Sequence, residues 1–248
     1  MVDVGSFPGG IERNQVLHLD AEEVSTVDPY RFVPLAILCL TPLACGHGKG
    51  PDEDAQIRVD AAQRSVSFRG RIYPSRFNAW YTRPKNHHFI VWKKGRAARN
   101  GLIRADVSDV EILHALERLG ARPGNNLTVD TWERRDDARS TAPDLRVQGT
   151  RVEIQLEWGT AHSLRVEDYL IDRQGSGFLF RVGGHKALVP VWKSGCVVCL
   201  QSCPGGRVSN ERHTMRDLAR GTSRFELRRD RLPNDGTAVR VTLRLLDS

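Results

Sequence analysis

Two segments of the chain begin with Gly-Thr and continue with an apolar residue at every second position. They are Gly149 to Leu156 (G-T-R-V-E-I-Q-L) and Gly236 to Leu243 (G-T-A-V-R-V-T-L). Alternation with a period of two is typical of a β-strand that buries one face and exposes the other. Residues 151–158 and 238–246 are therefore predicted strands, and their likeness suggests that one unit occurs twice.

Two further recurrences appear in the same order along the chain. V-W-K-K-G at 91–95 returns as V-W-K-S-G at 191–195, and V-S-D at 107–109 returns as V-S-N at 208–210. Self-similarity in a fixed order is the signature of a repeated structural unit. The three matches together indicate an internal duplication.

Each copy also carries helix signals after its V-S motif. Ser108 with Glu111 three residues later forms a capping box, and Gly120 is a suitable C-terminal cap. In the second copy, Ser209 and Gly221 stand at corresponding places, with fewer apolar residues between them. We expect one short helix per copy, of which the first has the clearer apolar stripe: Val110, Leu113, Leu116 and Leu119.

These patterns predict a β-rich α+β fold. Residues 64–72 and 87–93 are further strand candidates. The expected architecture is two similar halves, residues 57–162 and 163–248, each with antiparallel strands and one short helix.

Three of the five cysteines are concentrated in a C-x2-C-x3-C-P run made by Cys196, Cys199 and Cys203. Zinc and iron–sulfur clusters need several thiolates that converge on one point, and a short loop ending in Pro-Gly-Gly can provide them. We expect the run to lie in a loop that leads to the second helix, where a helix N-terminus favours thiolates. The run therefore predicts a metal-binding or redox site.

The run lacks one ligand of a four-cysteine site. His185, His213, a water molecule or a partner could supply the fourth. An iron–sulfur cluster would make the protein an electron-transfer module with a redox partner, whereas zinc with three Cys and one His is a closed structural geometry. Zinc fits export better, because a chain exported unfolded would not carry a preassembled cluster.

Two other interpretations of the run remain open. Cys196 or Cys199 could form a disulfide with Cys203, which would make the protein a non-enzymatic binding or structural protein of the envelope. A thiol–disulfide enzyme is less favoured, because no thioredoxin-like βαβ pattern surrounds the run.

His87 and His88 lie on a predicted strand and are expected to face opposite sides, so they should not share a metal ion. The sequence leaves enzymatic activity open and favours a non-enzymatic role.

The N-terminal part predicts export. Residues 1–45 end in a mostly apolar stretch from Phe32 to Ala44 before Cys45, which resembles a lipoprotein signal whose cysteine carries the lipid. Residues 46–56 are predicted to form a flexible tether. The alternative is a buried apolar segment in which Cys39 and Cys45 are ordinary core cysteines. The signal interpretation predicts a membrane-anchored protein of the cell envelope.

The net charge of +7 is carried mainly by arginines that are scattered along the chain. Scattered arginines are typical of a solvated surface, whereas nucleic-acid binding calls for a basic patch or stripe. We therefore expect no nucleic acid as a partner, and the membrane is expected as a partner through the lipid anchor at Cys45.

Three segments carry a resemblance to a known family. They are Phe89 to Trp92 (F-I-V-W), Ala105 to Gly124 (A-D-V-S-D-V-E-I-L-H-A-L-E-R-L-G-A-R-P-G) and Val191 to Ser209 with the cysteine run. Over about residues 57–246 the chain resembles the YdjY-domain proteins. The resemblance implies a bacterial protein, often exported or lipid-anchored, and in some members described as a ferredoxin-type iron–sulfur protein. Arg99-Asn100 stands where members often show His-Glu, so only Cys196, Cys199 and Cys203 carry over as site residues.

Overall fold

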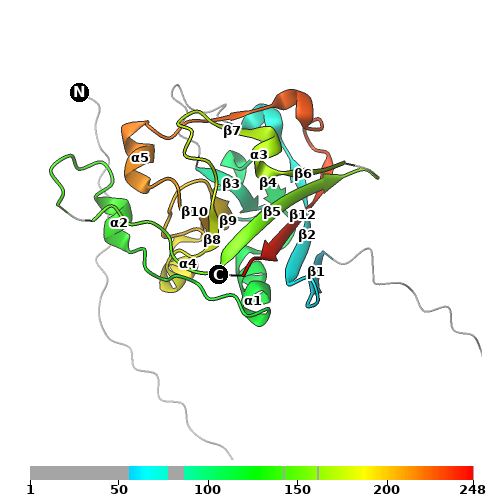
Figure 1. The fold of residues 1–248 in the computed structure, drawn as a ribbon, viewed down its shortest axis with the longest axis horizontal. Helices are drawn as coiled ribbons and strands as arrows, with labels where there is room; N and C mark the ends of the chain where they lie inside the picture. Colours follow the sequence, from blue (N-terminus) through cyan, green and yellow to red (C-terminus); the bar gives the residue numbers. More distant parts are fainter. Residues whose placement is uncertain (1–55, 78–86, 142, 161, 248) are drawn as a thin grey trace, which may run out of the picture. The chain divides into compact units, whose positions relative to one another are not determined.

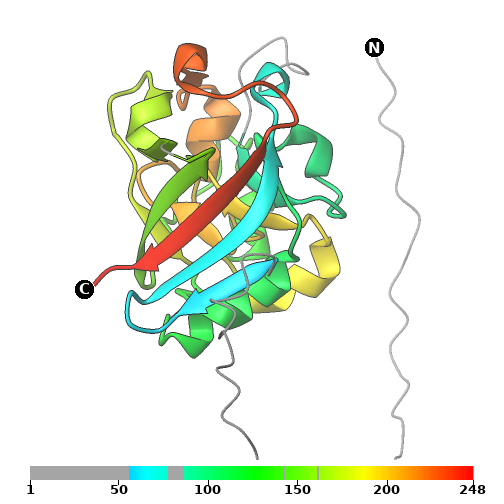
Figure 2. The ribbon, with the colours of Figure 1, turned by 90° about the vertical axis from the view of Figure 1, so that its right-hand side faces the viewer.

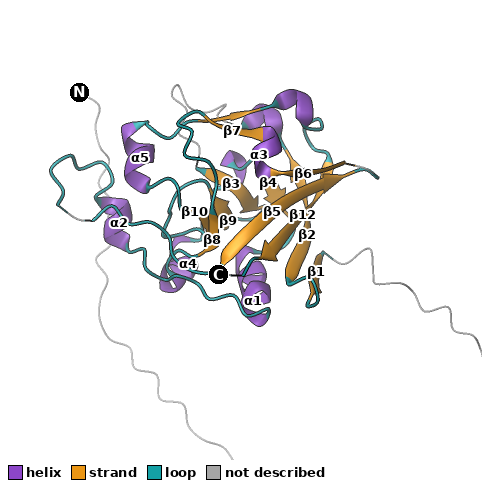
Figure 3. Ribbon diagram, in the orientation of Figure 1, coloured by secondary structure: helices purple, strands orange, loops and turns teal. Residues whose placement is uncertain are grey.

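The computed structural model describes residues 56–77, 87–141, 143–160 and 162–247, coloured along the sequence in Figure 1. They form a β-rich fold with short helices, which confirms the predicted α+β class (Figure 3). The strands are β1 (Ile57–Asp60), β2 (Ser65–Ile72), β3 (His88–Trp92), β4 (Ile103–Ala105), β5 (Arg151–Trp158), β6 (His162–Arg165), β7 (Leu170–Asp172), β8 (Phe180–Val182), β9 (Cys196–Cys199), β10 (Val208–Asn210), β11 (Phe225–Leu227) and β12 (Ala238–Leu245). The helices are α1 (Asp109–Arg118), α2 (Val129–Glu133), α3 (Val166–Tyr169), α4 (Val189–Trp192) and α5 (Met215–Arg220), with 3₁₀ turns η1 (Pro74–Arg76), η2 (Ala98–Asn100), η3 (Lys186–Leu188) and η4 (Arg229–Arg231).

Eight strands close into a barrel. Their order is β2-β12-β5-β8-β10-β9-β3-β4, and β4 returns to pair with β2. The pairs β3–β4 and β9–β10 are parallel, and the other barrel pairs are antiparallel. β1 pairs with β2 and β6 pairs with β5 outside the ring, while β7 and β11 form a separate two-stranded sheet. Closure leaves few open strand edges, because both edges of most barrel strands are bonded.

The segments in which apolar residues alternate with a period of two form the longest strands. The predicted strands 151–158 and 238–246 are β5 and β12, and the candidates 64–72 and 87–93 contain β2 and β3. In β2, β5 and β12 every second side chain is buried. These apolar rows point into the barrel and make up much of its core: Val66, Phe68, Ile72, Val152, Ile154, Leu156, Val239, Val241, Leu243 and Leu245.

The helix α1 begins and ends as the sequence predicted. The Ser108 hydroxyl accepts a hydrogen bond from the Glu111 backbone at 3.2 Å, and the Ser108 backbone donates to the Glu111 carboxylate at 3.1 Å. Gly120 follows the helix with a positive φ of 88°, a conformation that glycine adopts without strain. Ile112 and Leu116 are buried in the barrel core, so the capping box fixes where this apolar side begins.

Replacing Ser108 with alanine should lower the free energy of unfolding by about 1 kcal/mol at pH 7. Hydrogen bonds from the Ser108 hydroxyl and backbone lower the pKa of Glu111 below its ordinary 4.5. The resulting stabilisation is complete above pH 4.5 and is lost as the pH falls through the folded-state pKa. Urea titrations at pH 7 and pH 3 should show a smaller difference between wild type and Ser108→Ala at the lower pH. An equal difference at both values would contradict the role given to Glu111.

The internal duplication is not confirmed. Residues 91 and 92 end the strand β3, whereas the matching Val191 and Trp192 lie in the helix α4. Pro190 explains the difference, because it has no backbone N–H to give to a strand pair and suits the first turn of a helix. Strands from the two predicted halves also mix around one closed sheet, so that β12 lies between β2 and β5.

The predicted start of the second helix is wrong. Ser209 belongs to strand β10, and the cap of α5 is Thr214, whose hydroxyl accepts from the Asp217 backbone at 3.2 Å. The Thr214 to Asp217 pair is a capping box five residues after the expected one. The predicted end is confirmed, since Gly221 is a left-handed cap with a φ of 70°.

The expectations for residues 1–45 and for most of the tether 46–56 fall outside the described residues, and Cys39 and Cys45 are among them. In the part of the chain that the structure describes, none of the helices has the length and apolar character needed to cross a membrane.

Candidate functional site

The three cysteines of the run lie together on the wall of the barrel. Cys196 and Cys199 are the first and last residues of β9, and Cys203 lies between β9 and β10. All three side chains are buried and all three are free thiols. The expected loop is thus a strand at Cys196 and Cys199, so pairing within the sheet positions these two thiols. We call Cys196, Cys199 and Cys203 the thiol cluster.

An irregular pairing turns both strand thiols to the same side. Side chains three residues apart on a regular strand face opposite sides. Here Val91 pairs with Cys196 and Ile90 with Val198, which leaves Val197 as an extra residue on β9. Val197 and Val198 both join the barrel core, while Cys196 and Cys199 both join a second cluster. Re-aiming side chains in this way is a usual role of β-bulges.

The second apolar cluster encloses the thiols. Met215 and Leu218 of α5 are buried with the three cysteines, and Trp132 of α2 packs against them. The three cysteines thus belong to one buried cluster beside the barrel core.

The surroundings shift the pKa values of Cys199 and Cys203 in opposite directions. Burial, together with contacts to the other two thiols, raises the pKa of Cys199 well above its usual value. The pKa of Cys203 is lowered, first by the hydrogen bond from Cys199 and then by the backbone N–H groups of Gly205 and Gly206 and the charge of Arg207. Burial opposes this decrease. These interactions favour the thiolate of Cys203, which is the form that binds metals and reacts.

A buried ion pair stands beside the thiol cluster. The Arg207 guanidinium donates to the carboxylate of Asp109, the first residue of α1, and the two residues are only 1% and 4% exposed. Burial lowers the pKa of Arg207, and the carboxylate of Asp109 opposes that effect. The Arg207 backbone N–H also donates to the carbonyl of Cys196 at 3.2 Å. The pair thus connects the start of α1 to the strand that carries the thiols.

His88 adds an imidazole to the cluster. Its Nδ1 lies 3.4 Å from the Sγ of Cys196, and its backbone position is paired with Cys199. The expectation that His87 and His88 face opposite sides is wrong, because their ring centroids are 3.9 Å apart. Burial, and next the neighbouring His87, lowers the pKa of His88. It is therefore a neutral imidazole near pH 7, the form that binds metals.

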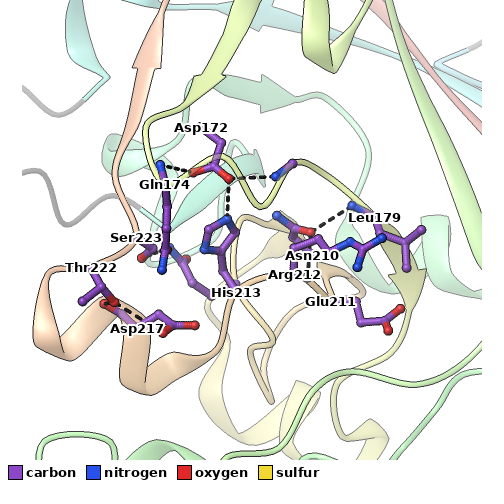
Figure 4. Close-up of polar contacts among 12 residues, drawn as sticks. Asp172, Gln174, Leu179, Asn210, Glu211, Arg212, His213, Asp217, Thr222 and Ser223 are labelled. Atoms are coloured by element: carbon purple, nitrogen blue, oxygen red, sulfur yellow. Dashed lines mark hydrogen bonds and ion pairs between the residues drawn. The ribbon is translucent and has the colours of Figure 1, made fainter.

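The histidines proposed from the sequence lie elsewhere. His213 Nε2 is 3.0 Å from Asp172 Oδ2, and this carboxylate also accepts from the backbone of Gln174 and Gly177 (Figure 4). His185 is half-buried, and its backbone donates to the carbonyl of Pro204 at 2.7 Å. Among the described residues, neither imidazole makes a hydrogen bond to a thiol of the cluster.

The donor set of the site is three sulfurs and one imidazole nitrogen. Within the described ranges, no group of three or more His, Cys, Asp and Glu side chains is already arranged as a metal site. The chemistry of the donors nevertheless fits a thiophilic ion, because Cys196, Cys199, Cys203 and His88 share one buried contact region. The N–H groups that surround Cys203 would stabilise a coordinating thiolate.

Arg207, Asp109 and His88 were not predicted from the sequence. Two of them stand in the segments that carry the family resemblance, since Asp109 follows V-S and Arg207 follows C-P-G-G. His88 could have been found only from the pairing of its strand with the cysteine strand.

The fold and the site define a class of protein: a closed eight-stranded barrel with a buried thiol cluster on its wall. The chain matches the YdjY domain over residues 57–244 and therefore belongs to the YdjY domain family. It is 28% identical over 228 residues to "Uncharacterized protein YdjY" of Escherichia coli (strain K12), an alignment that covers 86% of this chain and 95% of that protein. No solved structure matches the chain.

Proposed function

We propose that the protein is a lipoprotein of the cell envelope, anchored through Cys45, whose thiol cluster binds one thiophilic metal ion. One observation carries the proposal: three buried thiols face the same side of the barrel wall, with the His88 imidazole against Cys196. Cys196, Cys199, Cys203 and His88 would hold the ion in a closed four-ligand site, which stabilises the fold.

Zinc is preferred to an iron–sulfur cluster. Zinc–sulfur bonds of about 2.3 Å bring the ligand sulfurs into contact with one another, and the three cysteines already lie in one buried cluster. A cluster would need additional space, but Met215 and Leu218 pack against the thiols. Export of an unfolded chain also favours an ion that is acquired after export.

The charges near the site agree with a zinc ion. Three thiolates and a neutral imidazole around a divalent cation leave one net negative charge, and burial of an uncompensated charge is costly. Arg207 is buried beside the thiols, and its positive charge favours the thiolate of Cys203. The site therefore has a nearby cation for that charge.

The full chain should bind one Zn²⁺, and Co²⁺ in its place should give the visible absorption of a tetrahedral thiolate site. Cys199→Ser should weaken binding by more than the ~10–100-fold that loss of an outer hydrogen-bond partner costs. His114→Ala, which removes an exposed imidazole of α1 away from the cluster, should leave binding unchanged. Competition with a colorimetric chelator measures both variants. Stoichiometric iron with sulfide would replace zinc by a cluster and a redox partner as the working function.

A structural disulfide is the alternative, and the grouping of three free thiols in one buried cluster favours it. In that case reductant would lower stability as much as Cys203→Ser does, and chelator would have no effect. A count of one free thiol in the run after oxidising purification would overturn the metal proposal.

The membrane anchor is tested separately: Cys45→Ser should move the protein from the membrane pellet to the supernatant, and an unchanged distribution would argue against the anchor.

A further inference from the structure

Two loops from distant parts of the chain meet at one side of the barrel. They are residues 93–99, which follow β3, and residues 191–195, which include the end of α4; we call them the double loop. The loops touch through their backbones, since a Cβ added to Gly95 would lie 2.6 Å from the Cα of Gly195. In Figure 2, α4 (yellow) lies at the edge of the fold, and the long strands β2, β12 and β5 face the viewer.

The double loop carries exposed positive charge. The Arg96 backbone donates to the carbonyl of Lys193 at 3.1 Å, so basic residues of the two loops are neighbours. Lys93 is already paired, with its Nζ 2.8 Å from the Asp106 carboxylate. Within the described ranges, four other exposed cations of the double loop make no ion pair: Lys94, Arg96, Arg99 and Lys193.

An aliphatic side chain is exposed beside these cations. Val191 is 66% exposed, more than any other large hydrophobic residue that the structure describes. The next residue, Trp192, is half-buried, and its ring packs edge-on against Trp132 with centroids 5.7 Å apart. The aromatic pair thus supports α4 from below, while Val191 stays in water. Apolar side chains next to basic ones are typical of surfaces that enter the interface of a membrane.

The backbone of Lys193 adds a second observation. Lys193 ends α4 with a φ of 52°, in the left-handed region. Glycine is the usual residue at such a cap, and other residues adopt this conformation at a cost. A lysine here therefore supplies a charge at the expense of stability. It also offers a variant, Lys193→Gly, that removes the charge and relieves the backbone.

We propose that the double loop binds the surface of an anionic phospholipid membrane. Its four unpaired cations would lie among the lipid phosphates, and Val191 would enter the boundary between head groups and acyl chains. Each basic residue near such a surface strengthens binding about fivefold. Nucleic acid is less favoured, because its phosphates offer nothing to an exposed aliphatic side chain. This contact goes beyond the proposed anchor, since it needs no lipid on Cys45.

Sedimentation of the full chain with vesicles tests the proposal, with Cys45→Ser in every protein so that no lipid is attached. Vesicles of equal parts phosphatidylglycerol and phosphatidylcholine should bind at least tenfold more tightly than pure phosphatidylcholine, and salt should weaken this binding. Lys193→Gly should weaken it about fivefold without loss of stability in urea. Val191→Ser should weaken it about threefold. Arg58→Gln, at an exposed arginine of β1, is the matched control and should change nothing.

Equal binding to neutral vesicles, or none to anionic vesicles by a folded chain, would overturn the proposal. A loss in Arg58→Gln as large as that in Lys193→Gly would show that net charge, rather than the double loop, is responsible. Tighter binding to duplex DNA than to anionic vesicles would assign the cations to nucleic acid instead. Folded Cys199→Ser should bind vesicles as the parent does, so this result is independent of both the metal site and the lipid anchor.

Discussion

Asp109→Asn should lower the free energy of unfolding by about 3–5 kcal/mol, because it leaves the buried charge of Arg207 without its partner. The two residues are almost completely buried, and the Arg207 guanidinium donates directly to the carboxylate of Asp109. Loss of one partner of a buried pair costs more than the pair itself contributes. Chemical denaturation of the wild type and the variant at pH 7 measures the difference.

Two further variants separate this effect from general damage. Asp109→Leu combined with Arg207→Met removes both charges and should recover most of the stability, since apolar replacements of buried pairs are often neutral. Glu226→Gln breaks the exposed ion pair with Arg173 and should have no measurable effect. A double variant as unstable as Asp109→Asn would show that packing, rather than charge, makes this place sensitive.

The same pair should influence the thiol cluster. The charge of Arg207 is one of the causes that lower the pKa of Cys203. Without that charge, a smaller fraction of Cys203 is thiolate at neutral pH, and metal affinity depends on the thiolate. The folded double variant should therefore bind Zn²⁺ more weakly at pH 7, with the deficit shrinking as the pH rises.

Gly149→Ala should destabilise the protein by about 3–5 kcal/mol. Gly149 has a φ of 119°, a backbone conformation that side chains rarely adopt. A Cβ added there would lie 2.0 Å from the carbonyl oxygen of Val182 and 2.6 Å from the backbone nitrogen of Gly124. The expected loss adds the cost of a left-handed conformation to that of overpacking against backbone. Thermal and urea unfolding measure it.

Gly236→Ala is the matched control, because both glycines precede threonine at the start of a long strand. Gly236 has a φ of 81°, and nothing lies within 4 Å of an added Cβ. The substitution should cost only the conformational penalty of about 1–2 kcal/mol. Similar losses at Gly149 and Gly236 would show that the close approach to Val182 relaxes at little cost.

The sequence correctly predicted those strands and helix ends that depend on interactions between residues close in the chain. The alternation in β5 and β12 and the capping box of Ser108 depend on residues close in sequence, and both are confirmed. The closed barrel depends on pairings such as β2 with β12, whose residues are far apart in the chain. Nothing in a strand's own residues specifies its neighbour. The sequence therefore indicated strands without their order.

The site shows the same division. The spacing of Cys196, Cys199 and Cys203 predicted thiols that are close together, and the structure places all three in one buried cluster. The extra residue Val197 that turns Cys196 and Cys199 to one side could not be predicted, because a bulge depends on the partner strand. His88 was missed for the same reason, since its nearness to Cys196 comes from that pairing.

The internal duplication is not confirmed, and a proline is one local reason for the difference between the two copies. V-W-K-x-G occurs twice, yet Pro190 before the second copy prevents strand pairing and begins the helix α4. Identical letters therefore have different conformations, depending on the residue that precedes them.

The place of β12 has a consequence for the order of folding. β12 is the last barrel strand in the sequence, but it pairs with β2 on one side and β5 on the other. These three are the longest strands of the barrel. A chain emerging from a ribosome can form the capped helix α1 early, yet the ring stays open until residues 238–245 arrive. Completion of the barrel is thus a late event that depends on contacts of large sequence separation, and these form slowly. A growing chain of this kind therefore remains in an unclosed state until its last strand is synthesised.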